Sequence, residues 1–377
     1  MGDSAKEGHH EIHTRVHFKA MKYRVQESLI YGLLAAAFLF CCTRPALGIV
    51  VHPNEGEPNL IEWTDRPDPN VVGRWSSNAS FVVVAPNWII TTRHQSTSPT
   101  IVTIEGITYD CHYNSEWVGG SGGNADIQLI RLTTTDGGNP NLAHYASPYE
   151  GSDEKGQDVV IGGYGDGRGG LLKTRGTTYG YEWDNSSNTT LRLGTNKVDD
   201  TKNNNTLGSL TSDIIIADFD GLNEGESTVY ECIPAVHDSG GGWFIHDGNE
   251  WKVAGLSRAV DTHYEQGHFD DPNYILYEAW FRNKTNPNTL QPDYLDAVRI
   301  NSYAAWIHDI IYVPGDLTGD DWVDFTDFGA FANQWGRDDC SELNNWCEGA
   351  DFEPTNGSVD WDDLAFLADV WLTGWEY

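Results

Sequence analysis

Between about Val71 and Val260 the sequence is a succession of short β-rich runs separated by glycine, asparagine and aspartate. The clearest runs are SFVVVAPNWIITT, TIVTIEGITYD, DIQLIRL, DVVIGGYG, DIIIADF and WKVAGL. Many short strands with this punctuation indicate an antiparallel sandwich or barrel, and the sequence lacks the strand–helix alternation of a parallel sheet. The stretch 184–206, rich in asparagine and threonine, is predicted to be a surface loop.

A long helical pattern follows this region in YLDAVRINSYAAWIHDII, where apolar residues recur at the spacing of one helix face. The segment VPG at 313–315 then ends the helix and marks a boundary. Beyond it, VDFTDFGAFANQW (323–335) and VDWDDLAFLADVW (359–371) match at a period of 36 residues. Each copy is predicted to be an acidic loop that runs into a short amphipathic helix.

Length and charge narrow the class of protein. The chain has 377 residues, which exceeds the usual single domain and favours two or three folded units. Its formal net charge of −33 argues against binding nucleic acid or an anionic membrane through a basic surface. From Gly315 to Tyr377 the chain holds 16 Asp and Glu against Arg337 alone, a net charge of −15. That clustering of carboxylates needs its own explanation.

The first 48 residues are predicted to direct export. Leu29–Cys42 is an uncharged, mostly apolar run of 14 residues that follows several basic residues. It is too short for a comfortable membrane span but fits the apolar core of a signal peptide, and ALG at 46–48 supplies small residues for cleavage. A retained anchor is the alternative. Residues 1–48 are interpreted as a polar extension and signal peptide, so the mature protein is expected to be secreted or at the cell surface, without a membrane segment.

Export leaves four cysteines, an even number that permits disulfides in an oxidising compartment. Cys340 and Cys347 are close enough in sequence to bridge a small loop. Whether Cys111 and Cys232 pair is not decided by the sequence.

The run AVHDSGGGWF contains Ser239, whose hydroxyl is a poor nucleophile alone. A serine nucleophile needs a base to take its proton, and the base needs a carboxylate to orient it. His94 follows directly after an apolar run, and Asp126 opens a strand with alternating apolar residues. A single histidine beside a strand is more often structural, and an aspartate at a strand head is usually a turn former. The three together, in the order His94, Asp126, Ser239, favour a catalytic set.

These segments resemble the trypsin/chymotrypsin-like serine protease family. WIITTRHQ is similar to the family's histidine-bearing strand and turn, DIQLIRL to its aspartate-bearing strand, and HDSGGGWF to its nucleophile loop. VVIGGYG and YAAWIHDII are similar to an internal strand and to the closing helix. The resemblance spans about residues 49–311. It implies a mainly β domain over 49–312, built from two six-stranded antiparallel β-barrels with a closing C-terminal helix.

The resemblance also implies roles for individual residues. His94 would be the general base and acid, Asp126 its orienting carboxylate and Ser239 the acylated nucleophile. The backbone N–H groups of His237 and Ser239 would form the oxyanion hole. Glycine is usual at the position of His237, so strain is expected there.

Two further positions carry implied roles. Asp238 would pair with a new α-amino group at Ile49, which cleavage after Gly48 would release, so that secretion itself would activate the enzyme. The residue six before the nucleophile, which sets specificity in the family, is Ile233. An apolar residue there implies no acidic pocket floor and no obvious preference for Lys or Arg.

The acidic tail is predicted to bind two structural calcium ions. Calcium takes about six to eight oxygen ligands, and short loops with acidic or amide side chains at alternating positions supply them. An acidic, merely solvated tail is the alternative, but the repeat retains apolar helix positions. In DLTGDDWVDFTD the oxygens at positions 1, 3, 5, 7, 9 and 12 belong to Asp316, Thr318, Asp320, Trp322 (carbonyl), Asp324 and Asp327.

The second copy, DFEPTNGSVDWDD, offers similar oxygens with one extra residue near Pro354. The two loop–helix units over 315–377 resemble a type I dockerin-like module, which implies a small α-helical, EF-hand-like fold and a cohesin-like or cell-surface partner. The second set of oxygens belongs to Asp351, Glu353, Asn356, Ser358 (carbonyl), Asp360 and Asp363.

The sequence therefore favours a secreted serine endopeptidase that acts on protein or peptide substrates and whose chemistry needs no cofactor. The calcium-binding tail would serve anchoring or assembly. The alternative is a catalytically inactive, protease-like binding protein anchored through the same tail.

Overall fold

The computed structural model describes residues 49–52, 62–77, 79–95, 98–114, 118, 123–184, 189–261, 278–352 and 355–374. The predicted leader, residues 1–48, lies outside them. Among the described helices, none combines the length and apolar character that crossing a membrane requires.

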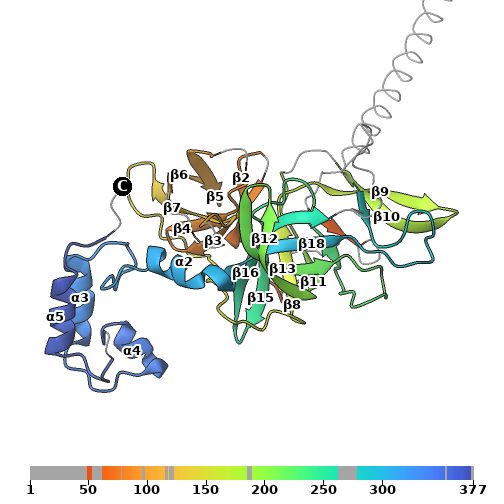
Figure 1. Cartoon of the computed structure of the whole chain (residues 1–377). Coiled ribbons are helices and arrows are strands. Elements are labelled where there is room, and N and C mark those ends of the chain that lie inside the picture. Colours follow the sequence, from red (N-terminus) through yellow and green to blue (C-terminus); the bar gives the residue numbers. More distant parts are fainter. Residues whose placement is uncertain are drawn as a thin grey trace, which may run out of the picture. The chain divides into compact units, whose positions relative to one another are not determined.

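The chain is mainly β, and its first sheet is a nearly closed six-stranded barrel in which neighbouring strands are antiparallel. Its interior holds Trp75, Phe81, Ile89 and Leu132, all buried. The run SFVVVAPNWIITT supplies two of its strands, as predicted, because its alternating apolar side chains have an interior to fill. The strands are, in sheet order, β2 (Val72–Trp75), β3 (Ala79–Ala85), β4 (Trp88–Thr91), β7 (Gln128–Thr134), β6 (Ile107–Tyr113) and β5 (Ile101–Ile104) (Figure 1).

The second sheet has seven strands where six were expected, and its closure into a second barrel stays a prediction. The expectation of a surface loop over 184–206 is wrong, because that stretch supplies both edge strands. The last of them has exposed and half-buried side chains, which explains its loop-like composition. The strands are, in order, β11 (Arg192–Lys197), β8 (Asp158–Gly163), β15 (Gly242–Asp247), β16 (Glu250–Asp261), β18 (Tyr294–Arg299), β13 (Leu210–Asp218) and β12 (Asp200–Leu207).

Two smaller sheets make up the rest of the β structure in the described residues. One contains β9 (Gly167–Thr174), β10 (Thr177–Asp184) and β17 (Glu278–Trp280). The other pairs β1 (Val50–Val51) with β14 (Cys232–Ile233), which brings the start of the described chain beside the segment that leads to Ser239. A short 3-10 helix, η1 (Pro69–Val71), precedes β2.

The predicted closing helix is shorter than its sequence pattern. Residues 294–299 form β18 between β13 and β16, followed by η5 (Ile300–Tyr303) and α2 (Ala304–Ile311). Leu295, Ala297 and Val298 are buried in the sheet, so tertiary pairing overrides the helical spacing at this end.

The two copies of the repeat form the predicted loop–helix units, α3 (Phe325–Gln334) and α5 (Trp361–Asp369). Each helix is capped by an aspartate, Asp324 or Asp360, in a reciprocal capping box. The two helices lie side by side (Figure 1). The rings of Trp335 and Trp361 are in edge contact. The chain boundary at 313–315 stays a prediction.

Between the two helices lie η6 (Glu342–Asn344) and α4 (Asn345–Glu348). The predicted disulfide joins Cys340 to Cys347. Cys111 and Cys232 do not pair: Cys111 is half-buried in β6 and Cys232 is buried in β14.

Candidate active site

Two paired strands of the first barrel position His94 and Asp126. His94 follows β4 and Asp126 precedes β7, and these strands pair with Thr91 opposite Gln128. The two side chains therefore leave the barrel at the same edge. Asp126 is fully buried, and its own N–H donates to the Ser212 hydroxyl at 2.8 Å, which fixes the start of β7.

Asp126 holds the His94 imidazole from two directions. Its Oδ1 accepts the His94 backbone N–H at 2.8 Å, and its Oδ2 lies 2.6 Å from Nδ1 of the ring. On the other side of the ring, Nε2 lies 2.8 Å from the Ser239 Oγ. The imidazole side chain is 26% exposed, so a substrate can reach it. The structure thus brings together the three side chains that the sequence singled out.

The nucleophile loop is held by backbone contacts to both sheets. The Ser80 N–H donates to the Ser239 carbonyl and the Gly240 N–H to the Ser257 carbonyl, each at 2.8 Å. Gly240 adopts φ +80, and a Cβ on it would lie 2.2 Å from the Thr91 Oγ1. Glycine is required there on both grounds. The first glycine after Ser239 is therefore required by the backbone conformation and the close packing of this loop.

His237, two residues before Ser239, has φ 76, the left-handed conformation that favours glycine. This is the position at which the sequence predicted strain. Its Nδ1 lies 3.5 Å from a carboxylate oxygen of Asp166, which is buried. The Asp166 N–H also donates to the Val236 carbonyl at 2.9 Å. Asp166 therefore contacts the nucleophile loop through both its side chain and its backbone. Within the described chain, the backbone N–H groups of His237 and Ser239 donate to no backbone carbonyl.

Asp238 lies fully buried beneath the nucleophile loop. Its carboxylate accepts the N–H groups of Ala235 (2.8 Å), Gly165 (2.6 Å) and Ile49 (3.2 Å). The structure thus brings the Ile49 backbone nitrogen to the Asp238 carboxylate, whereas the pairing with a freed α-amino group stays a prediction. Burial raises the pKa of Asp238 to about 7, although these donors and the charge of Arg192 oppose the rise.

A cavity of about 190 Å³ opens beside Ser239. Ile233, the predicted specificity residue, is not among its described lining residues; it is fully buried and pairs with Val50. The wall instead carries Arg258, whose guanidinium is paired with Asp296 at 2.6 and 2.9 Å. An arginine inside the apolar strand WKVAGLSRAV was the signal for it in the sequence. The lining residues are Trp183, Pro234, Ala235, Val236, Ser239, Ser257, Arg258, Ala259 and Val260.

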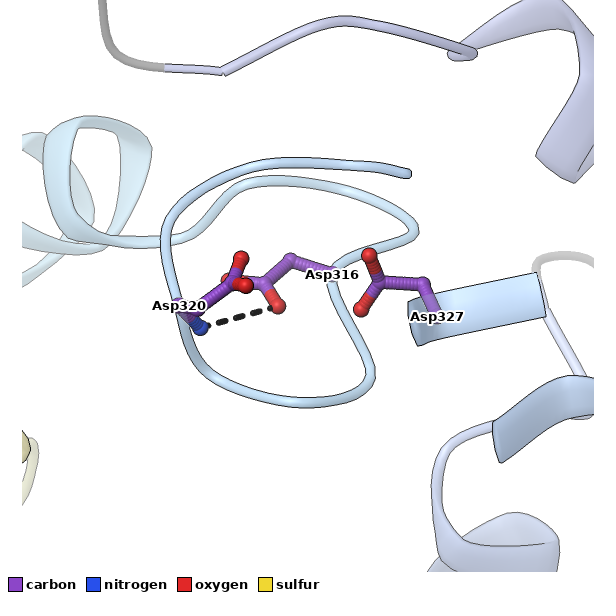
Figure 2. Close-up of side chains that lie close together, drawn as sticks. All are labelled: Asp316, Asp320 and Asp327. Carbon is purple, nitrogen blue, oxygen red and sulfur yellow. Dashed lines mark hydrogen bonds between the residues drawn. The ribbon is translucent and has the colours of Figure 1, made fainter. Parts of the chain in front are cut away.

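A second candidate site lies in the first acidic loop. One carboxylate oxygen from each of Asp316, Asp320 and Asp327 lies within 4.8 Å of the others, and Figure 2 shows the three side chains gathered inside the loop. Burial raises the pKa of Asp316 to about 6, and the negative charge of Asp327 adds to the rise. Clustered carboxylates that repel one another fit a hard divalent cation, which would remove the repulsion.

The other predicted ligands of this loop have partners of their own. The Thr318 hydroxyl donates to Asp327 at 3.0 Å, and the carboxylate of Asp324 accepts the N–H and hydroxyl of Thr326 as a helix cap, each at 2.7 Å. The Trp322 N–H donates to a carboxylate oxygen of Asp320 at 3.1 Å.

The second loop is only partly described, because Glu353 lies outside the described residues. Asp351 accepts the N–H groups of Asn356 and Gly357 at 3.0 and 2.9 Å, as Asp316 does with its own loop. Asp363 accepts the N–H groups of Phe352 and Asp360 at 2.7 and 2.8 Å. Asp360 caps α5, and the Asn356 side chain accepts the Ser358 N–H at 2.9 Å. The described part of this loop contains no group of three converging acidic, histidine or cysteine side chains.

Comparison with known proteins gives little further help. No protein-family model matches the chain. No curated protein matches it either. One similar solved structure is a serine-to-alanine mutant of Rv3671c from M. tuberculosis H37Rv in an inactive form. The similarity covers 64% of this chain and 86% of that chain, at 11% identity and a TM-score of 0.36. The function therefore has to be inferred from the side chains of this chain.

Proposed function

We propose that the chain is a secreted serine endopeptidase, with two β-barrels and a closing helix, that carries a calcium-binding C-terminal module. The observation that supports it most is the continuous series Asp126–His94–Ser239, joined at 2.6 and 2.8 Å. Its outer member is exposed to a cavity and its inner member is fully buried. This change in exposure from Ser239 to Asp126 suits Ser239 as the nucleophile, His94 as the base and Asp126 as the orienting carboxylate.

In the proposed reaction, His94 Nε2 takes the Ser239 hydroxyl proton as Oγ attacks the carbonyl carbon of a peptide bond. Asp126 accepts the Nδ1–H of His94, fixes the ring tautomer and stabilises the imidazolium. The N–H groups of Ser239 and His237 stabilise the developing oxyanion. His94 then gives the proton to the leaving amine, and a water activated by His94 hydrolyses the acyl-enzyme. The reaction needs no cofactor.

The cavity beside Ser239 is proposed to hold the side chain before the cut. Its described lining residues include Arg258, whose guanidinium is paired with Asp296, and no acidic residue. A Lys or Arg side chain would find no described carboxylate among the lining residues to pair with, so an uncharged side chain is the expected preference.

Maturation is proposed to occur by cleavage after Gly48, which makes the Ile49 nitrogen an ammonium. Asp238 already accepts the Ile49 N–H at 3.2 Å. A buried carboxylate whose partners are neutral N–H groups gains most from a charged donor.

The C-terminal module is proposed to bind calcium through Asp316, Asp320 and Asp327, with a second ion in the loop that begins at Asp351. A cohesin-like or cell-surface protein is its proposed partner, and the tail would then anchor the enzyme.

A fluorophosphonate probe tests the catalytic proposal. Labelling of Ser239 that is lost in His94→Ala and kept in His246→Ala, a change at an exposed histidine, would support it. N-terminal sequencing of the labelled protein tests the start at Ile49.

One observation favours a second candidate, a catalytically silent binding protein. His237 has φ 76, and a residue with a Cβ disfavours the backbone that an oxyanion hole requires. Absence of labelling in correctly processed, calcium-loaded protein would favour this binder.

A further inference from the structure

The first acidic loop makes a buried polar contact with the first barrel through Asp321. This residue is 7% exposed. Its carboxylate accepts hydrogen bonds from the Asn87 side-chain amide at 2.9 Å and the Trp88 indole at 3.4 Å, and its Oδ2 lies 3.2 Å from the Arg131 Nε. The ion pair with Arg131 is almost fully excluded from water, with side chains 8% and 4% exposed.

The barrel side of this contact is a group of polar side chains, which we call the socket and define as Asn87, Trp88, Arg131 and Asn139. Within it, Arg131 Nη2 donates to the Asn139 side-chain carbonyl at 2.5 Å. The loop backbone also contributes to this contact. The Gly319 carbonyl accepts a hydrogen bond from the Asn87 side-chain amide at 3.2 Å, and the Asp320 carbonyl accepts one from the Asn139 side-chain amide. Buried polar groups on both sides are thus paired with each other.

The backbone conformation at Asp321 indicates that its side chain is retained for the contact with the barrel. It has φ 64, a conformation that favours glycine. One period later, at the equivalent position of the second loop, the residue is Gly357, with φ +91. At this position the first loop has an aspartate, for which the left-handed backbone is unfavourable, whereas the second loop has the favourable glycine. The Asp321 side chain is the one that contacts Arg131.

The socket lies on the two strands that carry the candidate catalytic residues. Trp88 opens β4 and pairs with Arg131 in β7, and three residues along the same ladder Thr91 pairs with Gln128. His94 and Asp126 lie just beyond that end. Three residues of a strand span about 10 Å. A contact that holds Trp88 and Arg131 therefore stabilises the pairing on which the His94–Asp126 geometry depends.

We propose that residues 319–321 dock the C-terminal module into this socket and stabilise the β4–β7 pair. The module then acts as an internal support of the barrel as well as a tail. A cation in the loop formed by Asp316, Asp320 and Asp327 would order the backbone on both sides of Asp321 and strengthen the docking. This last step rests on the proposed calcium binding, whereas the docking itself does not.

Asp321→Gly in the full chain is the sharpest test, because glycine suits φ 64 and only the docking side chain is lost. It removes the Asp321 carboxylate from the buried ion pair with Arg131, so Tm of the barrel is expected to fall by about 5 °C or more. Hydrogen exchange of the amides in β4 and β7 should accelerate. Asp338→Asn, at an exposed acidic position of the same module, is the charge control and should change neither.

A double-mutant cycle with Arg131→Met keeps the test decisive if a single variant is poorly folded. The double variant should lose clearly less Tm than the sum of the two single losses, because both buried charges are then absent. An unchanged barrel Tm in Asp321→Gly, or strictly additive losses, would overturn the docking.

Calcium titration tests the coupling. In the wild type, calcium should raise Tm and slow exchange in β4 and β7; in Asp321→Gly it should still bind, by calorimetry, without protecting those strands. Equal protection in both proteins would overturn the coupling, and so would absence of calorimetric binding to the wild type, which would also end the calcium proposal. Neither result touches the fluorophosphonate test of Ser239.

Discussion

The nucleophile loop and the first acidic loop are built alike. Each is wound around a buried or half-buried aspartate that accepts three backbone N–H groups: Asp238 from Ala235, Gly165 and Ile49, and Asp316 from its own loop. In each, burial raises the pKa of that aspartate, to about 7 in Asp238 and to about 6 in Asp316. Each loop also contains a non-glycine residue at positive φ.

The loops differ in what surrounds the carboxylate. Among the described residues, the hydrogen-bond donors to Asp238 are neutral backbone N–H groups, and one of them is that of Ile49. Asp316 instead faces Asp320 and Asp327. The proposed partners follow this difference: a single ammonium suits the neutral donor set around Asp238, and a divalent cation suits the three carboxylates of the acidic loop. Asp126, paired with His94 on two sides, shows what a completed site looks like.

The largest expected effect comes from breaking the completed site. Asp126→Asn should lower kcat by about 10⁴-fold, because an amide can hold the imidazole in the wrong tautomer. Hydrolysis of a chromogenic peptide measures this, with Asp158→Asn as the matched control at an exposed strand position. A loss of less than about tenfold would show that Asp126 does not orient a catalytic base.

The site around Asp238 predicts a pH dependence of stability in the chain that still carries residues 1–48. The folded pKa is about 7, above the ordinary value of about 4, so between these values the folded state binds more protons. The free energy of unfolding should therefore fall as pH rises from about 4 to about 7, by up to about 4 kcal/mol.

Urea unfolding of the wild type and Asp238→Asn over this pH range isolates the effect. In the uncut protein, the free energy of unfolding of the wild type should fall further below that of Asp238→Asn as the pH rises toward 7. In protein that begins at Ile49 the ammonium should stabilise the carboxylate, and the asparagine variant should then be the less stable. The same pH dependence before and after cleavage would argue against this pair.

The acidic loop makes the next prediction. Calcium at about 100 times its Kd should stabilise the module by about 2.7 kcal/mol, and a chelator should remove that stabilisation. Asp327→Asn should lose most of it because Asp327 belongs to the converging group, whereas Asp324→Asn should keep it because asparagine also caps a helix. If thermal unfolding shows that Asp324→Asn and Asp327→Asn lose the same amount of calcium stabilisation, Asp324 is also a ligand.

The smallest effect compares the two left-handed residues directly. His237→Gly should stabilise the protein by about 1 kcal/mol or less, because glycine suits φ 76 and the side chain makes only a 3.5 Å contact with Asp166. The same substitution at Asp321 should destabilise. Thermal unfolding of the two variants gives the signs, and equal signs would remove the distinction between a strained residue and a docking residue.

Local sequence determined the elements whose signals lie within a few residues. The apolar alternation in SFVVVAPNWIITT predicted β3 and β4, and the 36-residue repeat predicted α3 and α5 with their acidic loops. It failed at Tyr294–Arg299, where a helical spacing became β18. Burial between β13 and β16 decided that segment, and no pattern inside it records its neighbours.

By itself, then, the sequence determined which side chains were available: His94, Asp126, Ser239, the carboxylates of the tail and a glycine-rich loop. Only the tertiary structure decided that the first three lie in series, that Arg258 rather than Ile233 lines the cavity, and that Asp321 enters the barrel. The physical reason is range. Propensity and periodicity act between near neighbours in the chain, whereas the register of paired strands sets which distant residues meet.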